Sequence, residues 1–375
     1  MKILFITNIP SPYRVDFFNE WGKTVELTVI FEGRFEDFKL NWKKNEKMSF
    51  ESVYLTPGAV NRKKLSFKII RYVQKNKFDG IVITNYSNLP ELLTLLYLRI
   101  AKIKFFLEVD GGIIKQDNVL RKIFKSFLVS KASWYLSSSK ETDDYLIHYG
   151  AKPEAIHRYP FSSQRNADVL EVPVNDETVK GIRKKLYITE EKVIVAVGRF
   201  IYSKGFDVLL EAAGSIDKNV GIYIVGGTPT EDYLRIKKEL GLTNVHFVDF
   251  KTSEQLREYY KAANVFVLPT REDIWGLVVN EAMACGLPVI TTDKCVAGLA
   301  LVRDDENGYI VRVDDKDQLA EKINKILRDD DLRQQMSANS LKKIREYTIE
   351  EMAIRHNEIF DEILGLKGKT NEAKD

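Results

Sequence analysis

Short apolar runs alternate with amphipathic stretches along the first half of the chain. The runs have the length of strands, and between them apolar residues recur at helical spacing. The expected strands are residues 2–7, 25–31, 80–83, 104–108 and 133–136, and the expected helices lie near 13–22, 64–77, 88–102, 118–131 and 139–149. Strands that alternate with helices form a parallel, doubly wound sheet, so this half is predicted to be α/β.

The second half repeats the alternation and predicts a second sheet of its own. Its expected strands are residues 193–197, 223–225, 245–248, 265–268, 289–290 and 308–313, and its expected helices are 206–216, 231–240, 253–262, 277–285, 316–329 and 331–346. A chain of 375 residues also exceeds the usual size of a single core. We therefore expect two domains, residues 1–165 and 191–346, joined by a linker at 166–190, with a final helix at 349–364 and a flexible tail at 365–375.

Composition narrows the class of protein. No apolar run reaches the roughly 20 residues of a membrane span, and the N-terminus resembles a first strand more than a signal peptide. Two cysteines cannot build a disulfide framework, and the four histidines are too scattered for a local metal motif. A globular protein of the reducing cytoplasm is the simplest interpretation.

Charge is divided unevenly between the two halves. Residues 1–165 hold 27 Lys and Arg against 17 Asp and Glu, whereas residues 166–375 hold 30 against 37. Two stretches of the first half, 61–77 and 120–131, are strongly basic helices. They are either solvated surface or a contact with an anionic membrane. Nucleic acid is a less favoured partner, because no known reading module accompanies the charge.

An acidic loop before a helix is the first candidate for chemistry. The buried strand 265–268 ends at Pro269, Glu272 and Asp273 follow, and a helix begins after Gly276 with Glu281 inside it. Free amides at a helix start bind anions, and carboxylates bind sugar hydroxyls, so the pattern suits a phosphorylated sugar. The alternative is an ordinary β-α-β crossover, because acidic residues favour helix N-termini in general.

A second loop carries cations. Arg199 and Lys204 follow the strand 193–197 and are flanked by Gly198 and Gly205. Two cations on a glycine-bounded loop before a helix suit a diphosphate, although a solvated turn gives the same pattern. In the first half, the stretches 8–14 and 108–112 also follow strands at the edge where such sheets bind ligands.

Together these residues resemble a known family. The run Gly198-Arg199…Lys204-Gly205-Phe-Asp207, followed by Asp273…Glu281-Ala-Met-Ala-Cys-Gly-Leu-Pro-Val289, is similar to the family 4 retaining glycosyltransferases of the GT-B fold. The resemblance covers roughly 190–345 and is looser before that. It implies two Rossmann-like domains facing across a cleft, with the final helix crossing back to the first domain. The nucleotide sugar would bind mainly to the second domain and the acceptor mainly to the first.

The resemblance also implies roles for single residues. Arg199 and Lys204 would hold the diphosphate, Glu281 the ribose and Asp273 the donor sugar, and these four would form the catalytic set. Other donor-binding positions would be Gly198, Gly227, Lys251 beside the base, Glu272, Trp275, Gly276, Leu277 and Val278.

Three positions depart from the family pattern. The first carboxylate is Asp273, eight positions before Glu281, with Glu272 beside it as a rival. The loop after the first strand is stiff, with Arg14 as its only cation, where the family often has glycines. The stretch 108–112 stands where the family often has a histidine. We assign Arg14, Asp110 and Gly111 to the acceptor or the donor-sugar side.

The expected activity is transfer of a sugar, with retention, from a nucleoside diphosphate to a glycan or lipid-linked acceptor, in the manner of bacterial surface polysaccharide synthesis. No metal or cofactor is expected, because Arg199, Lys204 and helix amides can stabilise the charge of the leaving phosphate. No Asp-X-Asp pair is placed to hold a divalent ion, and the Asp pairs at 304–305 and 314–315 look like solvated loops. The expected setting is the cytoplasm or the inner face of the cell membrane. The alternatives are a GT-B sugar-nucleotide epimerase and a non-catalytic nucleotide-sugar-binding protein.

Overall fold

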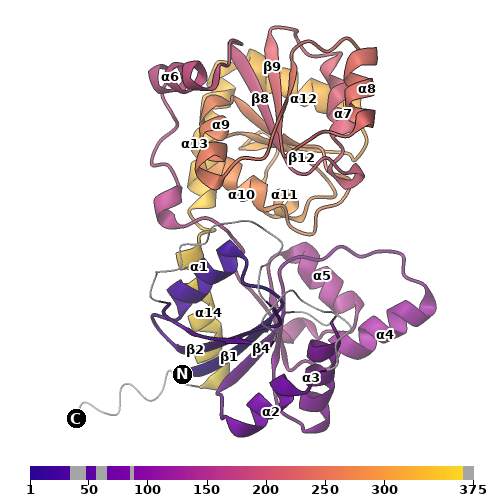
Figure 1. Ribbon diagram of the computed structural model, residues 1–375, viewed down its shortest axis with the longest axis vertical. Helices are drawn as coiled ribbons and strands as arrows, with labels where there is room; N and C mark the ends of the chain where they lie inside the picture. Colours follow the sequence, from indigo (N-terminus) through magenta and orange to yellow (C-terminus); the bar gives the residue numbers. More distant parts are fainter. Residues whose placement is uncertain (34–47, 56–65, 85–87, 366–375) are drawn as a thin grey trace. The chain divides into compact units, whose positions relative to one another are not determined.

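The computed structural model describes residues 1–33, 48–55, 66–84 and 88–365. Internal contacts divide the chain into two units, Met1–Ser162 with Thr348–Asp375, and Ser163–Tyr347. Each unit is a parallel sheet with helices packed on it (Figure 1). The predicted α/β class is therefore confirmed.

The first unit contains seven parallel strands in the order β3-β2-β1-β4-β5-β6-β7. They are β1 (Lys2–Thr7), β2 (Glu26–Phe31), β3 (Glu51–Tyr54), β4 (Gly80–Ile83), β5 (Phe106–Val109), β6 (Trp134–Ser137) and β7 (Ile156–Arg158). The strands β3 and β7 were not predicted. Both lie at the sheet edges and are only partly buried, so neither shows a run of apolar residues.

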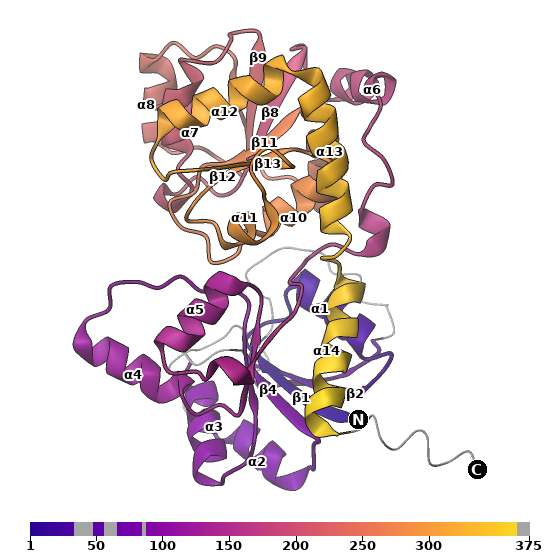
Figure 2. The ribbon, with the colours of Figure 1, turned by 180° about the vertical axis from the view of Figure 1, so that it is seen from behind.

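The helices of the first unit include one from the far end of the chain. They are α1 (Pro12–Trp21), α2 (Lys68–Lys75), α3 (Leu89–Ile100), α4 (Val119–Val129), α5 (Lys140–His148) and α14 (Ile349–Leu364). Figures 1 and 2 show α14 beside α1. The Trp21 indole donates to Asn357 Oδ1 at 2.9 Å and its ring lies 5.4 Å from that of Phe360. Apolar burial of these rings stabilises the packing of the final helix on the first unit, as the family resemblance implies.

The second unit has six parallel strands in the order β10-β9-β8-β11-β12-β13. They are β8 (Lys192–Val197), β9 (Val220–Val225), β10 (Val245–Val248), β11 (Val265–Leu268), β12 (Val289–Thr292) and β13 (Gly308–Val311). The chain order runs outward from β8 to β10 and then returns to β11 on the other side. The neighbours β8 and β11 therefore flank a topological switch point, where open α/β sheets bind ligands.

Helices cover both faces of this sheet (Figure 2). They are α6 (Asp176–Leu186), α7 (Phe206–Ala213), α8 (Glu231–Glu239), α9 (Ser253–Ala262), α10 (Leu277–Ala284), α11 (Val296–Leu301), α12 (Lys316–Arg328) and α13 (Asp330–Ile344). Leu209 of α7 and Ile323 of α12 pack in one buried cluster with Ile194 of β8. The helix α11 was not predicted, because six residues are too few to show helical periodicity.

The segment 166–190, which the sequence presents as a linker, is part of the second unit. The Leu170 amide donates to the Ala284 carbonyl at 3.0 Å. Arg183 of α6 donates to the Ala262 carbonyl and to Asn264 Oδ1, each at 2.8 Å. Polar composition alone did not reveal these bonds to distant backbone. Of the expected tail, residues 366–375 lie outside the described residues.

Candidate functional site

The loops after β8 and β11 lie at one edge of the second sheet, because both strands are parallel and adjacent. Two close backbone approaches shape this edge. A Cβ at Gly226, after β9, would lie 1.8 Å from the Gly198 carbonyl oxygen. Gly205, with φ of 65°, would place a Cβ 2.0 Å from the Pro269 carbonyl oxygen. Only glycine fits at either position, so the sequence fixes how closely neighbouring loops approach.

Hydrogen bonds join the β8 loop to the β11 loop. The Thr270 hydroxyl donates to the Ser203 carbonyl at 2.7 Å, and the Arg271 amide donates to the same carbonyl at 2.8 Å. The Arg271 guanidinium forms a two-pronged pair with Asp207 at the start of α7, with Nη1–Oδ1 at 2.9 Å and Nη2–Oδ2 at 2.6 Å. Its Nε donates to Asp314 Oδ1 at 2.7 Å. Arg271 is therefore a positioning residue that holds both loops in register.

Lys204 and Asp273 meet across the switch point. The Lys204 Nζ lies 2.6 Å from Asp273 Oδ2, and their side chains are 18% and 15% exposed. The Asp273 amide donates to the Lys294 carbonyl, which fixes the backbone beneath the carboxylate. The predicted phosphate cation and the predicted sugar carboxylate are thus brought into one ion pair. Arg199 is exposed, and its guanidinium has no partner among the residues that the structure describes.

The other acidic-loop residues are placed differently. Glu272 is half-buried, and its carbonyl accepts a hydrogen bond from Thr270. Trp275 is buried, and its indole donates to Asn280 Oδ1 at 2.9 Å. Trp275 was predicted to bind the donor, but its ring is packed inside the unit. We interpret it as a support for the start of α10.

Gly276 precedes the first residue of α10 as its N-cap, and its φ of 103° lies in the left-handed region. No side chain caps this helix start, so the first amides, including those of Leu277 and Val278, point along the helix axis without an intrahelical acceptor. Position 276 is also tight, since a Cβ there would lie 2.9 Å from the Cys295 sulfur. The predicted amide donors therefore stand next to the Lys204–Asp273 pair.

Glu281 lies in the second turn of α10 and accepts a hydrogen bond from the Tyr260 hydroxyl at 2.9 Å. Burial raises the pKa of Glu281 to about 7, against the opposing effects of the Tyr260 hydrogen bond and the charge of Arg257. Tyr260 itself is buried, and burial raises its pKa well above the usual range. Tyr260, like Arg271, was not identified from the sequence. It orients the carboxylate.

Two further positions that were predicted to bind the donor lie at the same sheet edge, after β9 and β10. Gly227 follows β9 with φ of 113°, and no atom lies within 4 Å of where its Cβ would stand. Lys251 follows β10, is half-buried and has no ionic partner among the described residues. Because the strand order is β10-β9-β8-β11, the four loops form one continuous row. The structure thus brings the second-unit site residues together.

In the first unit, a cluster of charged side chains lies at the carboxyl end of β5. Arg14 of α1 places Nη1 2.5 Å from Glu108 Oε1 and Nη2 2.5 Å from Asp110 Oδ1. Arg14 is 3% exposed and Glu108 is fully buried. Since both ends of its fork are occupied, Arg14 positions Asp110, and its assignment to the acceptor or the donor-sugar side stays a prediction. Gly111 stays partly exposed beside it.

Tyr159 and His356 complete this cluster. The Tyr159 hydroxyl donates to Asp110 Oδ1 at 2.8 Å, and His356 Nε2 lies 3.3 Å from Glu108 Oε2. Burial opposes ionisation of Glu108, but the Arg14 charge and the His356 hydrogen bond outweigh it and hold the pKa of Glu108 below its usual value. For Asp110, burial wins over the Arg14 charge and raises the pKa. The partly exposed Asp110 is the group of this cluster that a ligand can reach.

Metal-ligand geometry is not found in the part of the chain that the structure describes, where no three His, Cys, Asp or Glu are suitably grouped. The Asp pairs at 304–305 and 314–315 have other contacts. Asp305 accepts hydrogen bonds from Tyr309 and Lys325, and Asp314 from Arg271. The second-unit row offers, among other groups, the cations of Arg199 and Lys204, the amides at the start of α10 and the carboxylates of Asp273 and Glu281. That set can neutralise a diphosphate and bind hydroxyls.

Comparison with known proteins places these residues in context. Residues 179–343 match the family described as Glycosyl transferases group 1. A D-inositol 3-phosphate glycosyltransferase of Corynebacterium diphtheriae is 29% identical over 62% of this chain and 57% of its own length. A capsular polysaccharide biosynthesis glycosyltransferase of Staphylococcus aureus is 34% identical over 42% of each chain. The chain thus spans little more than half the length of the first of these relatives.

A solved structure extends the likeness to the whole fold. Anabaena HepE in complex with UDP superposes with a TM-score of 0.79 at 17% identity, over 96% of this chain and all of that chain. At this identity the likeness concerns the fold. It covers the first unit, where the sequence signal is weak, as well as the second.

Proposed function

We propose that this chain is a retaining glycosyltransferase, because residues 179–343 match the glycosyl transferases group 1 family and the chain has the GT-B fold. It moves a hexosyl group from a nucleoside diphosphate to a glycan or lipid-linked acceptor. The observation that carries the proposal is the Lys204–Asp273 pair across the switch point of the second sheet. Arg199, whose guanidinium has no partner among the described residues, stands in the same row.

The site suggests how the donor is bound. Lys204 leaves Asp273 to pair with the incoming diphosphate, and Arg199 contributes a second cation. Asp273 is then free to accept hydrogen bonds from sugar hydroxyls. The amides at the start of α10 donate to the phosphate or the sugar, and Glu281 accepts from the ribose hydroxyls. One ion pair thus holds both ligand-binding groups in place until the donor arrives.

The chemical step follows from the same charges. The bond between the anomeric carbon and the β-phosphate oxygen breaks, and a bond from the acceptor oxygen forms on the same face. The acceptor proton passes to the departing phosphate. Negative charge grows on that phosphate, where Lys204, Arg199 and the α10 amides stabilise it, so we expect no metal or cofactor requirement. The first unit, with Asp110 at its strand edge, is proposed to bind the acceptor.

Two relatives support a role in making surface or lipid-linked glycans. One is named for capsular polysaccharide biosynthesis, and a solved structure of like fold is described as acting in lipopolysaccharide biosynthesis. We propose surface polysaccharide synthesis as the setting. HepE was solved with UDP-glucose, which makes uridine nucleotides a sensible first choice of donor.

Screening nucleoside diphosphate sugars by thermal shift, followed by product analysis with candidate acceptors, tests the proposal. A correct donor should raise the melting temperature, because ligands stabilise the state that they bind. With that donor, Asp273→Asn should lower kcat/KM about 100-fold or more, and Glu272→Gln by less than about fivefold, because Asp273 is the carboxylate that lies 2.6 Å from Lys204. The two substitutions each remove one charge from adjacent positions, so each is a matched control for the other.

Other outcomes would contradict the proposal. Donor converted to an isomer without acceptor would indicate an epimerase. Binding of nucleotide sugars with neither transfer nor hydrolysis would indicate a binding protein. A larger loss in Glu272→Gln than in Asp273→Asn would move the sugar contact to Glu272. Inversion at the anomeric carbon, read by NMR of the first product, would exclude the retaining mechanism.

The raised pKa of Glu281 predicts a pH dependence of donor binding. In the free protein Glu281 is mostly protonated below pH 7 and mostly charged above it, since its pKa is about 7. The charged form accepts hydrogen bonds from ribose more strongly. Affinity for the nucleotide sugar should therefore rise about three- to tenfold between about pH 6 and pH 8.

Calorimetry in buffers of different ionisation enthalpy measures this effect directly. Donor binding near neutral pH should release protons from Glu281 in the wild type. The Glu281→Gln variant keeps a hydrogen-bond acceptor for the Tyr260 hydroxyl. It should bind the nucleotide sugar weakly at every pH and release no protons on binding. An intact nucleotide sugar is used because its diphosphate has no proton that titrates in this range. An unchanged pH profile in the variant would assign the effect to another group.

A further inference from the structure

The helix α4 of the first unit exposes its apolar side. Five side chains, Val119, Leu120, Ile123, Phe124 and Phe127, are between 48% and 79% exposed. At 3.6 residues per turn they fall within an arc of about 140°. We call these five residues the α4 ridge. The helix lies at the margin of the unit, as Figures 1 and 2 show.

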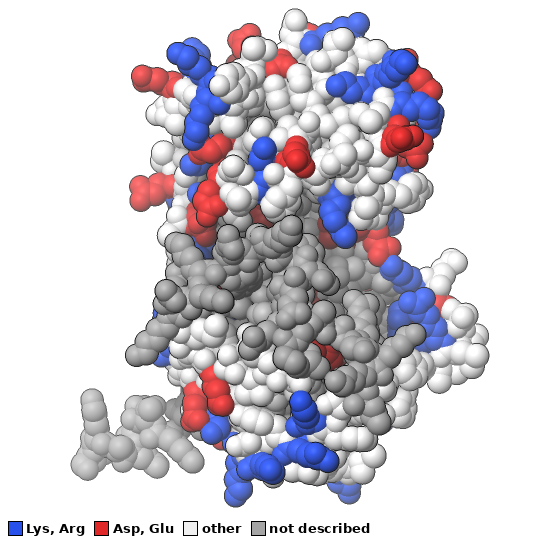
Figure 3. All heavy atoms as spheres, in the orientation of Figure 1, with Lys and Arg blue, Asp and Glu red and all other residues white. Residues whose placement is uncertain are grey.

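The polar side of α4 is basic and lies away from the ridge. Arg121, Lys122 and Lys125 occupy the other half of the helix surface. Arg121 and Lys125 form ion pairs with Asp117, whereas Lys122 has no ionic partner among the described residues. Figure 3 shows Lys and Arg side chains over α4 next to uncharged surface. An apolar face that points to solvent, with cations along its border, is the pattern of helices that lie in a membrane interface.

A pocket next to the ridge adds a second, independent feature. It has a volume of about 480 Å³ and lies between the end of α3 and the end of α4. Arg99, Lys102, Lys104 and Lys131 line it, and none of them has a carboxylate partner among the described residues. Phe127 belongs both to the pocket wall and to the α4 ridge. The pocket and the ridge therefore form one continuous surface.

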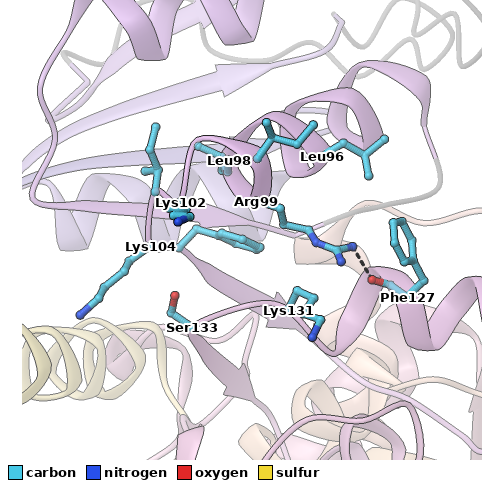
Figure 4. Close-up of a pocket in the computed structure, with 11 residues that line it drawn as sticks. Leu96, Leu98, Arg99, Lys102, Lys104, Phe127, Lys131 and Ser133 are labelled. Carbon is cyan, nitrogen blue, oxygen red and sulfur yellow. Dashed lines mark hydrogen bonds between the residues drawn. The ribbon is translucent and has the colours of Figure 1, made fainter.

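The cations of the pocket are held in different ways (Figure 4). The Arg99 guanidinium donates to the Phe127 carbonyl at 2.5 Å and lies 4.1 Å from the centre of the Phe127 ring. Figure 4 shows Lys131 on the same side of the pocket, whereas the Lys104 ammonium points outward. Arg99 is thus fixed in place with donors left over, and the lysines add mobile charge around it.

We propose that the α4 ridge and this pocket form a docking surface for a membrane containing anionic lipids. The ridge inserts between lipid headgroups, and the pocket binds the phosphate of one headgroup. Each apolar side chain that enters the interface leaves water, and each cation near the surface is attracted to the negative leaflet. This goes beyond sugar transfer, because it assigns a surface of the first unit that contains none of the donor residues.

Charge favours a membrane over other occupants of the ridge. A second copy of this chain, packed ridge to ridge, would bring the unpartnered lysines of both copies close together, where they repel. An anionic membrane supplies an apolar interior for the α4 ridge and negative charge for the cations of the pocket. No helix in the described part of the chain is long and apolar enough to cross a bilayer. The surface described here would lie on the membrane without spanning it.

Cosedimentation of the full chain with vesicles tests the proposal. Vesicles of phosphatidylcholine with phosphatidylglycerol should bind the protein, and vesicles of phosphatidylcholine alone should bind it at least about tenfold more weakly. The ridge variant Ile123→Gln/Phe124→Gln and the pocket variant Lys102→Glu/Lys131→Glu should each lose about tenfold or more in affinity for the anionic vesicles. All four side chains are exposed, so the fold should be kept.

Matched controls come from the second unit. Lys218→Glu/Lys238→Glu makes the same charge change at exposed lysines, and Leu234→Gln/Leu240→Gln removes two comparably exposed apolar side chains. Both control variants should bind vesicles like the wild type. Equal losses in the controls, or no binding by the wild type, would overturn the proposal.

Two additional measurements separate other ligands from the membrane. If glycerol phosphate displaces the protein from vesicles and the ridge variant binds normally, the pocket is a site for free phosphate. If the wild type is a dimer by light scattering and the ridge variant is a monomer with unchanged vesicle binding, the ridge joins two copies. Either result would overturn the proposal. Neither readout uses sugar transfer, so failure here is distinct from failure of the proposed enzymatic activity.

Discussion

Lys204→Ala is expected to lower kcat for sugar transfer about 10²–10³-fold, the usual effect of removing one preorganised group that stabilises developing charge. The Lys204 ammonium lies 2.6 Å from Asp273 and is only partly exposed, so its charge acts in a site from which much water is excluded. The Lys204→Ala substitution should also weaken binding of the nucleoside diphosphate by about 1.5–3 kcal/mol, the range for hydrogen bonds to charged groups. Initial rates and calorimetric titration measure the two effects separately.

Loss of Lys204 also leaves Asp273 without its partner, and the unpaired carboxylate would repel the diphosphate. The double variant Lys204→Ala/Asp273→Asn removes that repulsion. It should recover part of the nucleotide affinity but little of kcat, because the cation is still missing. Lys204→Arg keeps the charge and should retain more activity than Lys204→Met.

Arg199→Ala gives a test without this complication. Arg199 is exposed and has no partner among the described residues, so its removal should leave the melting temperature unchanged while it lowers nucleotide affinity. Lys218→Ala, at an exposed lysine of the same unit away from the row of strand-end loops, is the matched control and should behave as wild type. Full activity in both Lys204→Ala and Arg199→Ala would disprove the assignment of the diphosphate site.

The sequence was sufficient to indicate the residues of the proposed donor side, because these residues stand in local patterns. Parallel strands place the residues after β8 and β11 at one edge, and both strands are continuous apolar runs that can be recognised without a structure. Strand order brings Lys204 and Asp273 to the same edge, and the structure adds that they form an ion pair. Which of Asp273 and Glu272 contacts the donor sugar stays a prediction, because adjacent carboxylates on a loop differ in direction and not in composition.

Contacts between distant residues could not be predicted. Arg271 and Asp207 are joined by a two-pronged ion pair, but neither stands in a pattern that marks the other. His356 and Glu108 meet only because α14 returns to the first unit. The orientation of α4 was equally hidden, since an amphipathic pattern shows that a helix has two faces and does not show which one is buried. Tertiary packing decides such questions.

The buried cluster of the first unit should govern its stability. Arg14→Ala is expected to destabilise this unit by about 3–5 kcal/mol, because it leaves the fully buried Glu108 without its cation. Arg14→Lys should also be destabilising, since one ammonium cannot make both of the bonds that Nη1 and Nη2 make to Glu108 and Asp110. Hydrogen exchange followed by mass spectrometry reads the effect in peptides from β1 and β5, with peptides from β8 of the second unit as an internal control.

The effect should depend on pH with a defined sign. In the wild type the pKa of Glu108 is lowered, so its pair with Arg14 contributes stability above the unfolded-state pKa that is lost as the pH falls through the folded-state pKa. In Arg14→Ala burial acts unopposed by the Arg14 charge and raises the pKa of Glu108, so the variant gains a proton as the pH falls. The gap in stability between the two proteins should therefore narrow from pH 8 toward about pH 5.

Two comparisons distinguish this mechanism from a general loss of packing. Arg158→Ala removes an exposed arginine that pairs with Asp143 in the same unit, and it should cost less than about 1 kcal/mol at every pH. Adding Glu108→Gln to Arg14→Ala removes the stranded charge, so the double variant should be more stable than Arg14→Ala alone and should lose its pH dependence. If the deficit of Arg14→Ala were constant with pH and unchanged by Glu108→Gln, the cost would arise from lost volume and not from a buried, uncompensated carboxylate.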